Sequence, residues 1–213
     1  MGFASANRLS LLGARFFLLA VTVAAAHADQ RSSPANYGSG QILSKLADPQ
    51  YQGPDAGYEV MGFNNRGQAV GNAIFYPITA AVPKQMAALL WQNGRVTKLE
   101  GLPGYTNSYA EWINDRGQIV GFVSTLALTD RAVLWQHGRI RDLGTLPGGH
   151  SSRAYSINSR GQIVGTSDGV ACLWTKGRIS KLPGIEGTVI NDRGQILANT
   201  RQGAGYLLLT PSH

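Results

Sequence analysis

Cysteine is almost absent from this chain of 213 residues, which contains only Cys172. One thiol cannot form a disulfide within the chain, so no internal cross-link of this kind holds the fold together. Cys172 lies in the apolar run Val170–Trp174, which is typical of a small buried side chain. A disulfide to another molecule is the alternative use of this thiol.

Enzyme signatures are also lacking. The sequence has no GxSxG nucleophile elbow, no HExxH zinc motif and no phosphate-binding loop. The histidines after residue 28 are His137 in a turn, His150 in a glycine-rich loop and the terminal His213. The serine beside His150 does not indicate a catalytic pair, because such pairs are assembled in space rather than along the chain. We therefore predict that the protein is not an enzyme and has no catalytic residues.

Long apolar runs are missing, with one exception near the start. Residues 16–26 form an apolar run of 11 residues that follows Arg8 and Arg15 and leads into Ala26-His27-Ala28. This run is too short to span a bilayer and has the flanks of a cleaved signal peptide, so we predict a signal over 1–28. We expect the mature chain to be exported to the periplasm or the extracellular space, without a transmembrane segment. Its net charge is +5 instead of +7.

What the sequence does contain is a repeat. One string occurs in four copies: FNNRGQAVG from Phe63, INDRGQIVG from Ile113, INSRGQIVG from Ile157 and INDRGQILA from Ile190. A second string follows each copy and ends at Trp91, Trp135, Trp174 and, in decayed form, Leu209. A third string, such as GRIRDL, comes after a tight turn. Successive tryptophans are 44 and 39 residues apart, close to the length of one propeller blade.

Each string has the composition of a β-strand bounded by turns. Asn, Asp and Gly tolerate the conformations of tight hairpins, and here they separate runs rich in Val, Ile and Leu. We predict four antiparallel strands per unit: one ending at Ile-Asn, one from GQIVG, one of AxLW and one of GRIxxL. No segment has the period of an amphipathic helix, so the fold class is all-β. The predicted units span 50–99, 100–143, 144–182 and 183–213 of a single domain, 29–213.

The last unit lacks its fourth strand, and a matching string, GQILSKL at 40–46, precedes the first unit. A four-stranded sheet with two apolar faces needs neighbours on both sides, and radial stacking of such sheets gives a propeller. We therefore predict a monomeric four-bladed β-propeller, in which residues 38–49 complete the last blade and close the ring. The alternative is an open or dimer-completed stack of the same four units.

These strings also carry a family resemblance. INDRGQIVG, AVLWQHGRIRDLGTLPGG and the terminal LLLTP are similar to the repeats of the HAF-type extracellular repeat proteins of bacteria. The resemblance covers Gly40 to Pro211 and implies an exported protein of β-repeat architecture. It implies no particular biochemical activity and supplies no catalytic residues. The chain departs from the pattern at Ala198, where other copies have Gly, and at Leu209, where they have Trp.

The loops at one end of the predicted sheets vary in length, and binding sites commonly lie on such loops. The longest joins the second and third strands of the first unit and contains the apolar segment 74–78. This segment is either a partner-binding loop or a loop folded over its own blade. Aromatic side chains among Gly and Pro suit carbohydrate or peptide contacts, with loop bracing as the alternative. The candidate ligand-binding residues are Phe75, Tyr76, Tyr105, Tyr109, His150 and Tyr155.

Charged residues recur where the first strand of each unit begins. If these strands are innermost, Glu59, Glu111, Arg153 and Glu186 surround the mouth of a central channel. Carboxylate oxygens suit Ca²⁺, so a calcium site is one hypothesis. A satisfied polar plug, without a metal or any other cofactor, is the alternative. Paired carboxylates are also what a glycosidase uses.

Arginine recurs in the turns at the opposite end. The first turn of each unit carries Arg66, Arg116, Arg160 and Arg193, and the second turns carry Arg95, Arg139 and Arg178. This basic turn face either docks on anionic lipid or polysaccharide or is simply solvated beside nearby aspartates. Interleaved aromatic residues are missing from these turns, so we predict no nucleic-acid binding.

Together these features favour a binding module whose loop end contacts a protein or polysaccharide partner. A structural surface protein without a small ligand is the alternative, and a carbohydrate-active enzyme with carboxylates at the channel mouth is the third hypothesis.

Overall fold

The computed structural model of the chain describes residues 57–75, 85–200 and 205–211, which belong to one unit spanning residues 42–213. The predicted signal peptide at 1–28 and the predicted closing strand within 38–49 lie outside the described residues. No helix occurs in the described part of the chain, and therefore none there is long and apolar enough to cross a membrane.

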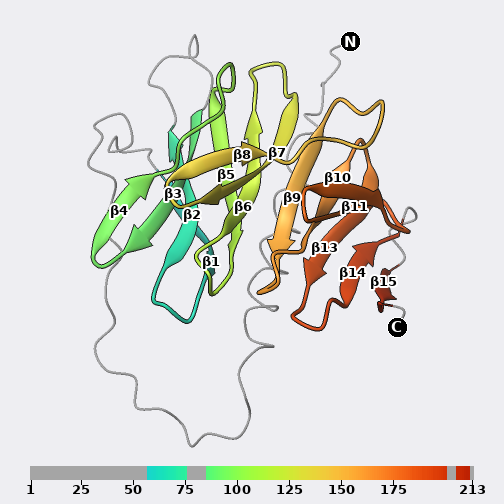
Figure 1. Ribbon diagram of the computed structural model, residues 1–213. Coiled ribbons are helices and arrows are strands. Elements are labelled where there is room, and N and C mark those ends of the chain that lie inside the picture. Colours follow the sequence, from blue (N-terminus) through green and yellow to red (C-terminus); the bar gives the residue numbers. More distant parts are fainter. Residues whose placement is uncertain (1–56, 76–84, 201–204, 212–213) are drawn as a thin grey trace, which may run out of the picture. The chain divides into compact units, whose positions relative to one another are not determined.

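The described strands form four antiparallel sheets, one for each repeat (Figure 1). The first sheet contains β1 (Gly57–Phe63), β2 (Ala69–Phe75), β3 (Gln85–Gln92) and β4 (Arg95–Lys98). The second contains β5 (Asn107–Ile113), β6 (Ile119–Ser124), β7 (Asp130–Gln136) and β8 (Arg139–Asp142). The third contains β9 (Ser152–Ile157), β10 (Ile163–Ser167), β11 (Val170–Thr175) and β12 (Arg178–Lys181). The fourth contains β13 (Glu186–Ile190), β14 (Ile196–Asn199) and β15 (Tyr206–Leu209).

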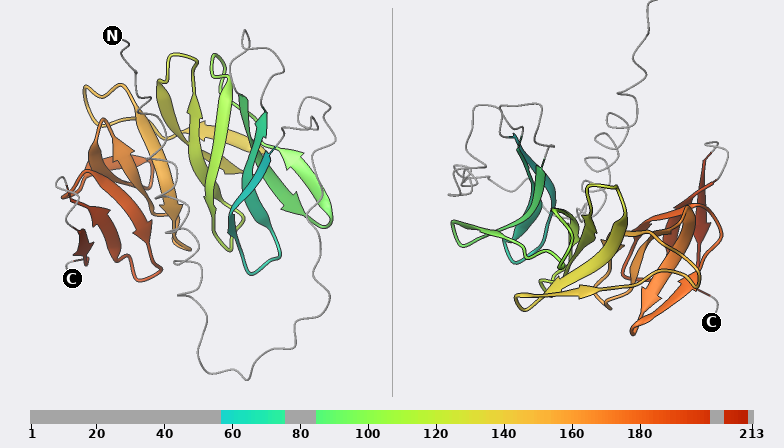
Figure 2. Two further views of the ribbon diagram at one scale, coloured as in Figure 1. Left: turned by 180° about the vertical axis from the view of Figure 1, so that it is seen from behind. Right: turned by 90° about the horizontal axis from the view of Figure 1, so that it is seen from above.

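The strands of every sheet pair in chain order, so the predicted all-β fold of antiparallel repeated units is confirmed. Three sheets have the predicted four strands, and the fourth has three described strands, β13, β14 and β15. This agrees with the sequence, in which the last repeat has no copy of the third string after Leu209. Figure 2 shows the same sheets from two further sides, each with the twist expected of β-strands.

The turn between the first two strands explains the Asn-x-Arg-Gly-Gln string. The Asn64 side-chain oxygen accepts hydrogen bonds from the backbone N–H groups of Arg66 and Gln68, at 3.0 and 3.1 Å. Its amide nitrogen donates to Gln68 Oε1 at 2.8 Å, and Gly67 adopts a φ of 71°. Asn, Gln and Gly therefore close the turn with their side chains or conformation, whereas Arg66 contributes its backbone N–H.

A close backbone approach explains the glycine that ends GQIVG. A Cβ atom on Gly71, Gly121 or Gly165 would lie 1.8 to 2.0 Å from a carbonyl oxygen of the first strand. Each approach occurs beside a β-bulge, where the pairing register of the first strand shifts. In the fourth sheet the buried Ala198 takes this place and pairs with Gly187.

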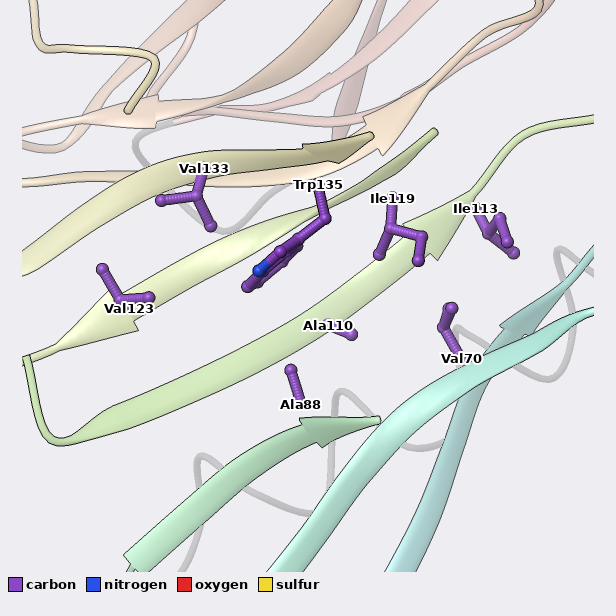
Figure 3. Packing of buried hydrophobic residues seen from close by; sticks show 8 residues of the cluster. All are labelled: Val70, Ala88, Ala110, Ile113, Ile119, Val123, Val133 and Trp135. Carbon is purple, nitrogen blue, oxygen red and sulfur yellow. The ribbon is translucent and has the colours of Figure 1, made fainter. Parts of the chain in front are cut away.

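Successive sheets pack face to face through apolar side chains. Val70 and Ala88 of the first sheet contact Ala110, Ile113 and Trp135 of the second, together with further residues of that sheet (Figure 3). A second cluster joins the second and third sheets in the same way, and a third joins the third and fourth sheets. The contacts that the structure gives between described strands therefore run from each sheet to the next.

Candidate functional site

The four predicted channel-mouth residues act on one another electrostatically. They come from the first strands of the four sheets, which are β1, β5, β9 and β13. Burial raises the pKa of the half-buried Glu111 to about 8. The Arg153 cation opposes this rise, whereas the carboxylates of Glu186 and Glu59 add to it. Glu111 is therefore within electrostatic reach of Glu59, Arg153 and Glu186, the other residues that the sequence assigned to the channel mouth.

Arg153 is held by a carboxylate that the alignment did not identify. Its Nε and Nη2 atoms lie 2.6 and 2.5 Å from Oδ2 of Asp130, a buried residue at the start of β7. The guanidinium carbon also lies 4.6 Å from the centre of the Phe122 ring. Tyr109 stacks on the same ring with centroids 4.4 Å apart. Arg153 of the third sheet is thus clamped onto the second sheet, which leaves less of its charge for a ligand.

Glu186 is held by polar neighbours of its own. Asn199 Nδ2 donates to its carboxylate at 3.2 Å. Burial raises the pKa of Glu186, and hydrogen bonds from Tyr155 and Asn199 hold the rise in check. Burial also raises the pKa of the Tyr155 hydroxyl, which therefore stays protonated at neutral pH. Glu186 and Tyr155 form a hydrogen-bonded polar group beside Glu111.

The described residues contain no group of three His, Cys, Asp or Glu side chains placed to hold a metal ion. Of the carboxylates at the predicted channel mouth, Glu186 accepts a hydrogen bond from Asn199, and burial raises the pKa of Glu111 to about 8. The calcium site stays a hypothesis.

The candidate aromatic residues of the loop end do not gather at one place. Tyr105 is half-buried against the first apolar cluster, and its hydroxyl accepts a hydrogen bond from Arg131 Nε at 3.5 Å. Tyr109 stacks on Phe122, and Tyr155 hydrogen-bonds to Glu186. His150 is exposed, with its backbone N–H donating to the Asp168 carboxylate. Phe75 ends β2, but its side chain and Tyr76 lie outside what the structure describes.

A short loop between β6 and β7 carries two exposed leucines that the sequence did not single out. Leu126 and Leu128 are 60% and 79% exposed. The loop is closed by hydrogen bonds from Thr129 N to Thr125 Oγ1, from Thr125 N to Thr129 O and from Leu128 N to Thr125 O, at 3.0 to 3.1 Å. Leu128 has a φ of 60°, a strained value for a leucine. The apolar string Leu126-Ala127-Leu128 between two polar threonines was the available signal.

The basic turn face is exposed, as the sequence predicts. Its four first-turn members are Arg66, Arg116, Arg160 and Arg193. Neighbouring turns adjoin each other, since a Cβ atom on Gly117 would lie 3.8 Å from Arg66 Nη1 and one on Gly194 would lie 2.6 Å from Arg160 Nη2. The ion pairs between described side chains are Arg131–Asp142 and Arg153–Asp130, so no such pair neutralises these four arginines.

Comparison with known proteins supplies no assignment, because no protein-family model matches the chain and no characterised protein matches it. The resemblance to HAF-type repeat proteins stays a prediction from the repeat strings.

Proposed function

We propose that this protein is an exported interaction module, built from propeller-type blades, whose loop end binds a partner. The observation that carries the proposal is the pair of exposed leucines on the loop between β6 and β7. Their side chains stay in water although hydrogen bonds fix the loop and Leu128 has a strained backbone. Backbone strain is concentrated at functional sites, and exposed apolar surface is a feature of contact sites, so the two together support a contact surface on this loop.

The chemistry of these side chains favours a protein partner. Leucine offers aliphatic surface to an apolar pocket, whereas carbohydrate sites depend on flat aromatic rings and polar groups. The candidate aromatics Tyr105, Tyr109 and Tyr155 are half-buried in contacts of their own, so they offer a glycan less surface than the leucines offer a protein. A polysaccharide partner is the alternative, with His150 as its exposed contact.

Propeller-type packing is supported by the repeated contacts between successive sheets. A closed ring needs one more contact, between the first and fourth sheets. The segment 40–46 as the closing strand stays a prediction, and the dimer-completed stack stays its alternative.

Site-specific photo-crosslinking tests the proposed loop contact. A photoreactive amino acid replaces the exposed Ala127, between the two leucines, and a control protein carries it at the exposed Lys176 of the opposite turn face. With cell-envelope fractions we expect one product of defined mass from position 127 only, and its loss when Leu126 and Leu128 are both changed to Asp. Equal labelling from both positions, or labelling that survives the double change, would overturn the proposal. The absence of any product would favour the structural surface protein.

One observation favours the enzyme hypothesis. Glu111 keeps its proton near neutral pH, as the general acid of a glycosidase does, and Glu59 and Glu186 lie close enough to affect it. Hydrolysis of bacterial envelope polysaccharides by the purified protein, abolished in Glu111→Gln, would support this alternative. A hydrolytic activity that persists when Glu59, Glu111 and Glu186 are all changed to Gln would exclude the carboxylate mechanism.

A further inference from the structure

The first turns of the four sheets are bonded to one another and form one strip. We call it the first-turn strip, and it consists of residues 64–68, 114–118, 158–162 and 191–195. A ladder of asparagines runs along it: Asn64 Nδ2 donates to the Asn114 carbonyl and Asn114 Nδ2 to the Asn158 carbonyl, both at 2.9 Å. Asn158 Nδ2 continues the ladder to the Asn191 carbonyl at 3.1 Å. These bonds fix each turn relative to the next.

The aspartates of the strip also join neighbouring turns. Both carboxylate oxygens of Asp115 accept hydrogen bonds from Asn65, one from its backbone N–H and one from its side-chain amide, each at 2.8 Å. Asp192 Oδ1 accepts from the Ser159 backbone N–H at 2.8 Å. The sequence left open whether these aspartates neutralise the nearby arginines. Their oxygens bond to the preceding turn, and no ion pair between described side chains includes an arginine of the strip.

Each turn of the strip carries one exposed arginine. In every turn the asparagine side chain accepts from the backbone N–H of this arginine at 3.0 Å, and the arginine side chain makes no hydrogen bond within the turn. Two of the side chains extend along the strip. A Cβ atom on Gly117 would lie 3.8 Å from Arg66 Nη1, and one on Gly194 would lie 2.6 Å from Arg160 Nη2. Each of these guanidinium groups therefore reaches the turn that carries the next arginine. The four arginines are Arg66, Arg116, Arg160 and Arg193.

This arrangement suits a ligand with repeated anionic groups. Four arginines face two aspartates in the strip, and cations held on neighbouring turns repel one another unless an anion lies between them. A guanidinium group offers a fork of donors that matches a carboxylate. Packed sheets lie about 10 Å apart, so successive arginines stand at steps that one small anion cannot bridge. A linear polymer with a carboxylate on successive units can follow them.

We propose that the first-turn strip binds a linear uronate polysaccharide, whose carboxylates pair with the arginines of successive turns. Every other residue of the strip is Asn, Asp, Ser, Gly or Gln, and their amides and hydroxyl groups suit sugar hydroxyls. A neutral glycan would need the flat aromatic rings that the strip lacks. Membrane-docking faces add apolar or aromatic side chains that enter the interface, and the strip has none of these either.

The strip and the loop of the proposed function lie at opposite ends of the strands. The turn at 114–118 precedes β6, and the loop with Leu126 and Leu128 follows it. A polysaccharide on the strip therefore leaves the two leucines accessible, and the two contacts can be tested separately.

Binding of the purified protein to immobilised polygalacturonate and alginate, two linear uronate polymers, tests the proposal at physiological salt. We compare two double variants that lose the same charge. Arg116→Gln with Arg160→Gln removes the two middle arginines of the strip. Arg141→Gln with Lys181→Gln removes exposed cations of β8 and β12, outside the turns. Loss of two exposed ion pairs should weaken binding by about tenfold in the first variant, and the second should bind like wild type.

Thermal unfolding serves as the control for folding, and both variants should unfold at the wild-type temperature because none of the four side chains closes a turn. Equal weakening in the two variants would overturn the proposal, since net charge alone would then explain the binding. Failure of the wild type to bind either polymer would overturn it, as would equal binding to neutral dextran. Tighter binding to phosphatidylglycerol vesicles than to both polymers would assign the strip to a membrane surface instead. None of these outcomes depends on whether Leu126 and Leu128 bind a partner.

Discussion

One repeat position has opposite environments in the middle and at the start of the chain. Ile157 of the third sheet is 2% exposed in the cluster that joins the second and third sheets. Phe63, its counterpart in the first sheet, is 65% exposed. Both residues end the first strand of a unit and precede the same Asn-x-Arg-Gly-Gln turn. Their turns have the same hydrogen bonds, but Ile157 contacts the preceding sheet, whereas Phe63 has no such sheet to contact among the described residues.

This difference shows that the exposure of a repeat position depends on whether a neighbouring sheet covers it. A repeat protein is stabilised by its units and by the contacts between neighbouring units, and the end units lose one such contact. Repeat proteins with solvated ends usually cap them with polar residues. In this chain Val60 and Phe63 are exposed at one end, although Leu89 and Trp91 of the same sheet are buried, and Leu197 and Leu208 are exposed at the other end.

The largest expected effect comes from truncating the buried member of this pair. Ile157→Ala leaves a cavity between two sheets and should lower the free energy of unfolding by about 2–5 kcal/mol. Phe63→Ala removes an exposed ring and should cost about 0.5 kcal/mol or less in dilute solution. Urea unfolding of both variants in dilute solution measures the difference between their free energies of unfolding. Equal losses would show that a part of the same chain covers Phe63.

A middle-sized effect concerns how stability depends on pH. It compares one repeat position, which is Glu111 in the second sheet and Met61 in the first. The pKa of Glu111 rises from its ordinary value of 4.5 to about 8 in the folded protein. Between these values the folded state holds a proton that the unfolded state releases, so stability falls as pH rises from about 4.5 to about 8. The slope that Glu111 contributes is at most about 1.4 kcal/mol per pH unit.

Glu111→Met gives the second sheet the residue of the first and should flatten this slope. Thermal unfolding at several pH values measures it, with Glu111→Gln as the control that keeps the size and polarity of the side chain. Glu186, whose pKa burial also raises, contributes a slope of the same sign in all three proteins. An unchanged slope in both variants would show that Glu111 ionises normally.

The strands and turns could be predicted from the sequence because their causes are local. The Asn64 side chain bonds only to groups within four residues when it closes its turn, so the string itself reveals the hairpin. The repeat alignment also assigned Glu59, Arg153 and Glu186 to equivalent strand positions and Glu111 to the next position on the same face, and the structure puts Glu111 within electrostatic reach of the other three.

Contacts between sheets could not be predicted in the same way. The ladder bond from Asn64 to Asn114 joins residues 50 positions apart, and Asp130 clamps Arg153 from a loop end in another sheet. The repeat shows which positions are equivalent but not which of them meet across two sheets. The exposed loop leucines were missed for a related reason, because exposure depends on what the rest of the chain leaves uncovered.

The smallest expected effect compares two tryptophans at one position of the two inner sheets. Trp135 Nε1 donates to the Glu100 carbonyl at 2.7 Å, whereas the buried indole nitrogen of Trp174 has no hydrogen-bond partner within the described structure. Gly144, the counterpart of Glu100, accepts a hydrogen bond from Ser152 Oγ at 2.9 Å and none from Trp174. The inner sheets therefore share their apolar contacts but differ in this one bond.

Replacing each tryptophan by phenylalanine measures the difference. Both changes remove similar ring area, but only Trp135→Phe breaks a hydrogen bond, and Trp174→Phe removes a buried donor that lacks a partner. We expect Trp135→Phe to lower the free energy of unfolding by about 1–2 kcal/mol more than Trp174→Phe. Equal losses would mean that the Trp174 donor has an acceptor in solution. That acceptor would then be a water molecule in the adjacent cavity of about 160 Å³, which Asp142, Leu143 and Trp174 help to line.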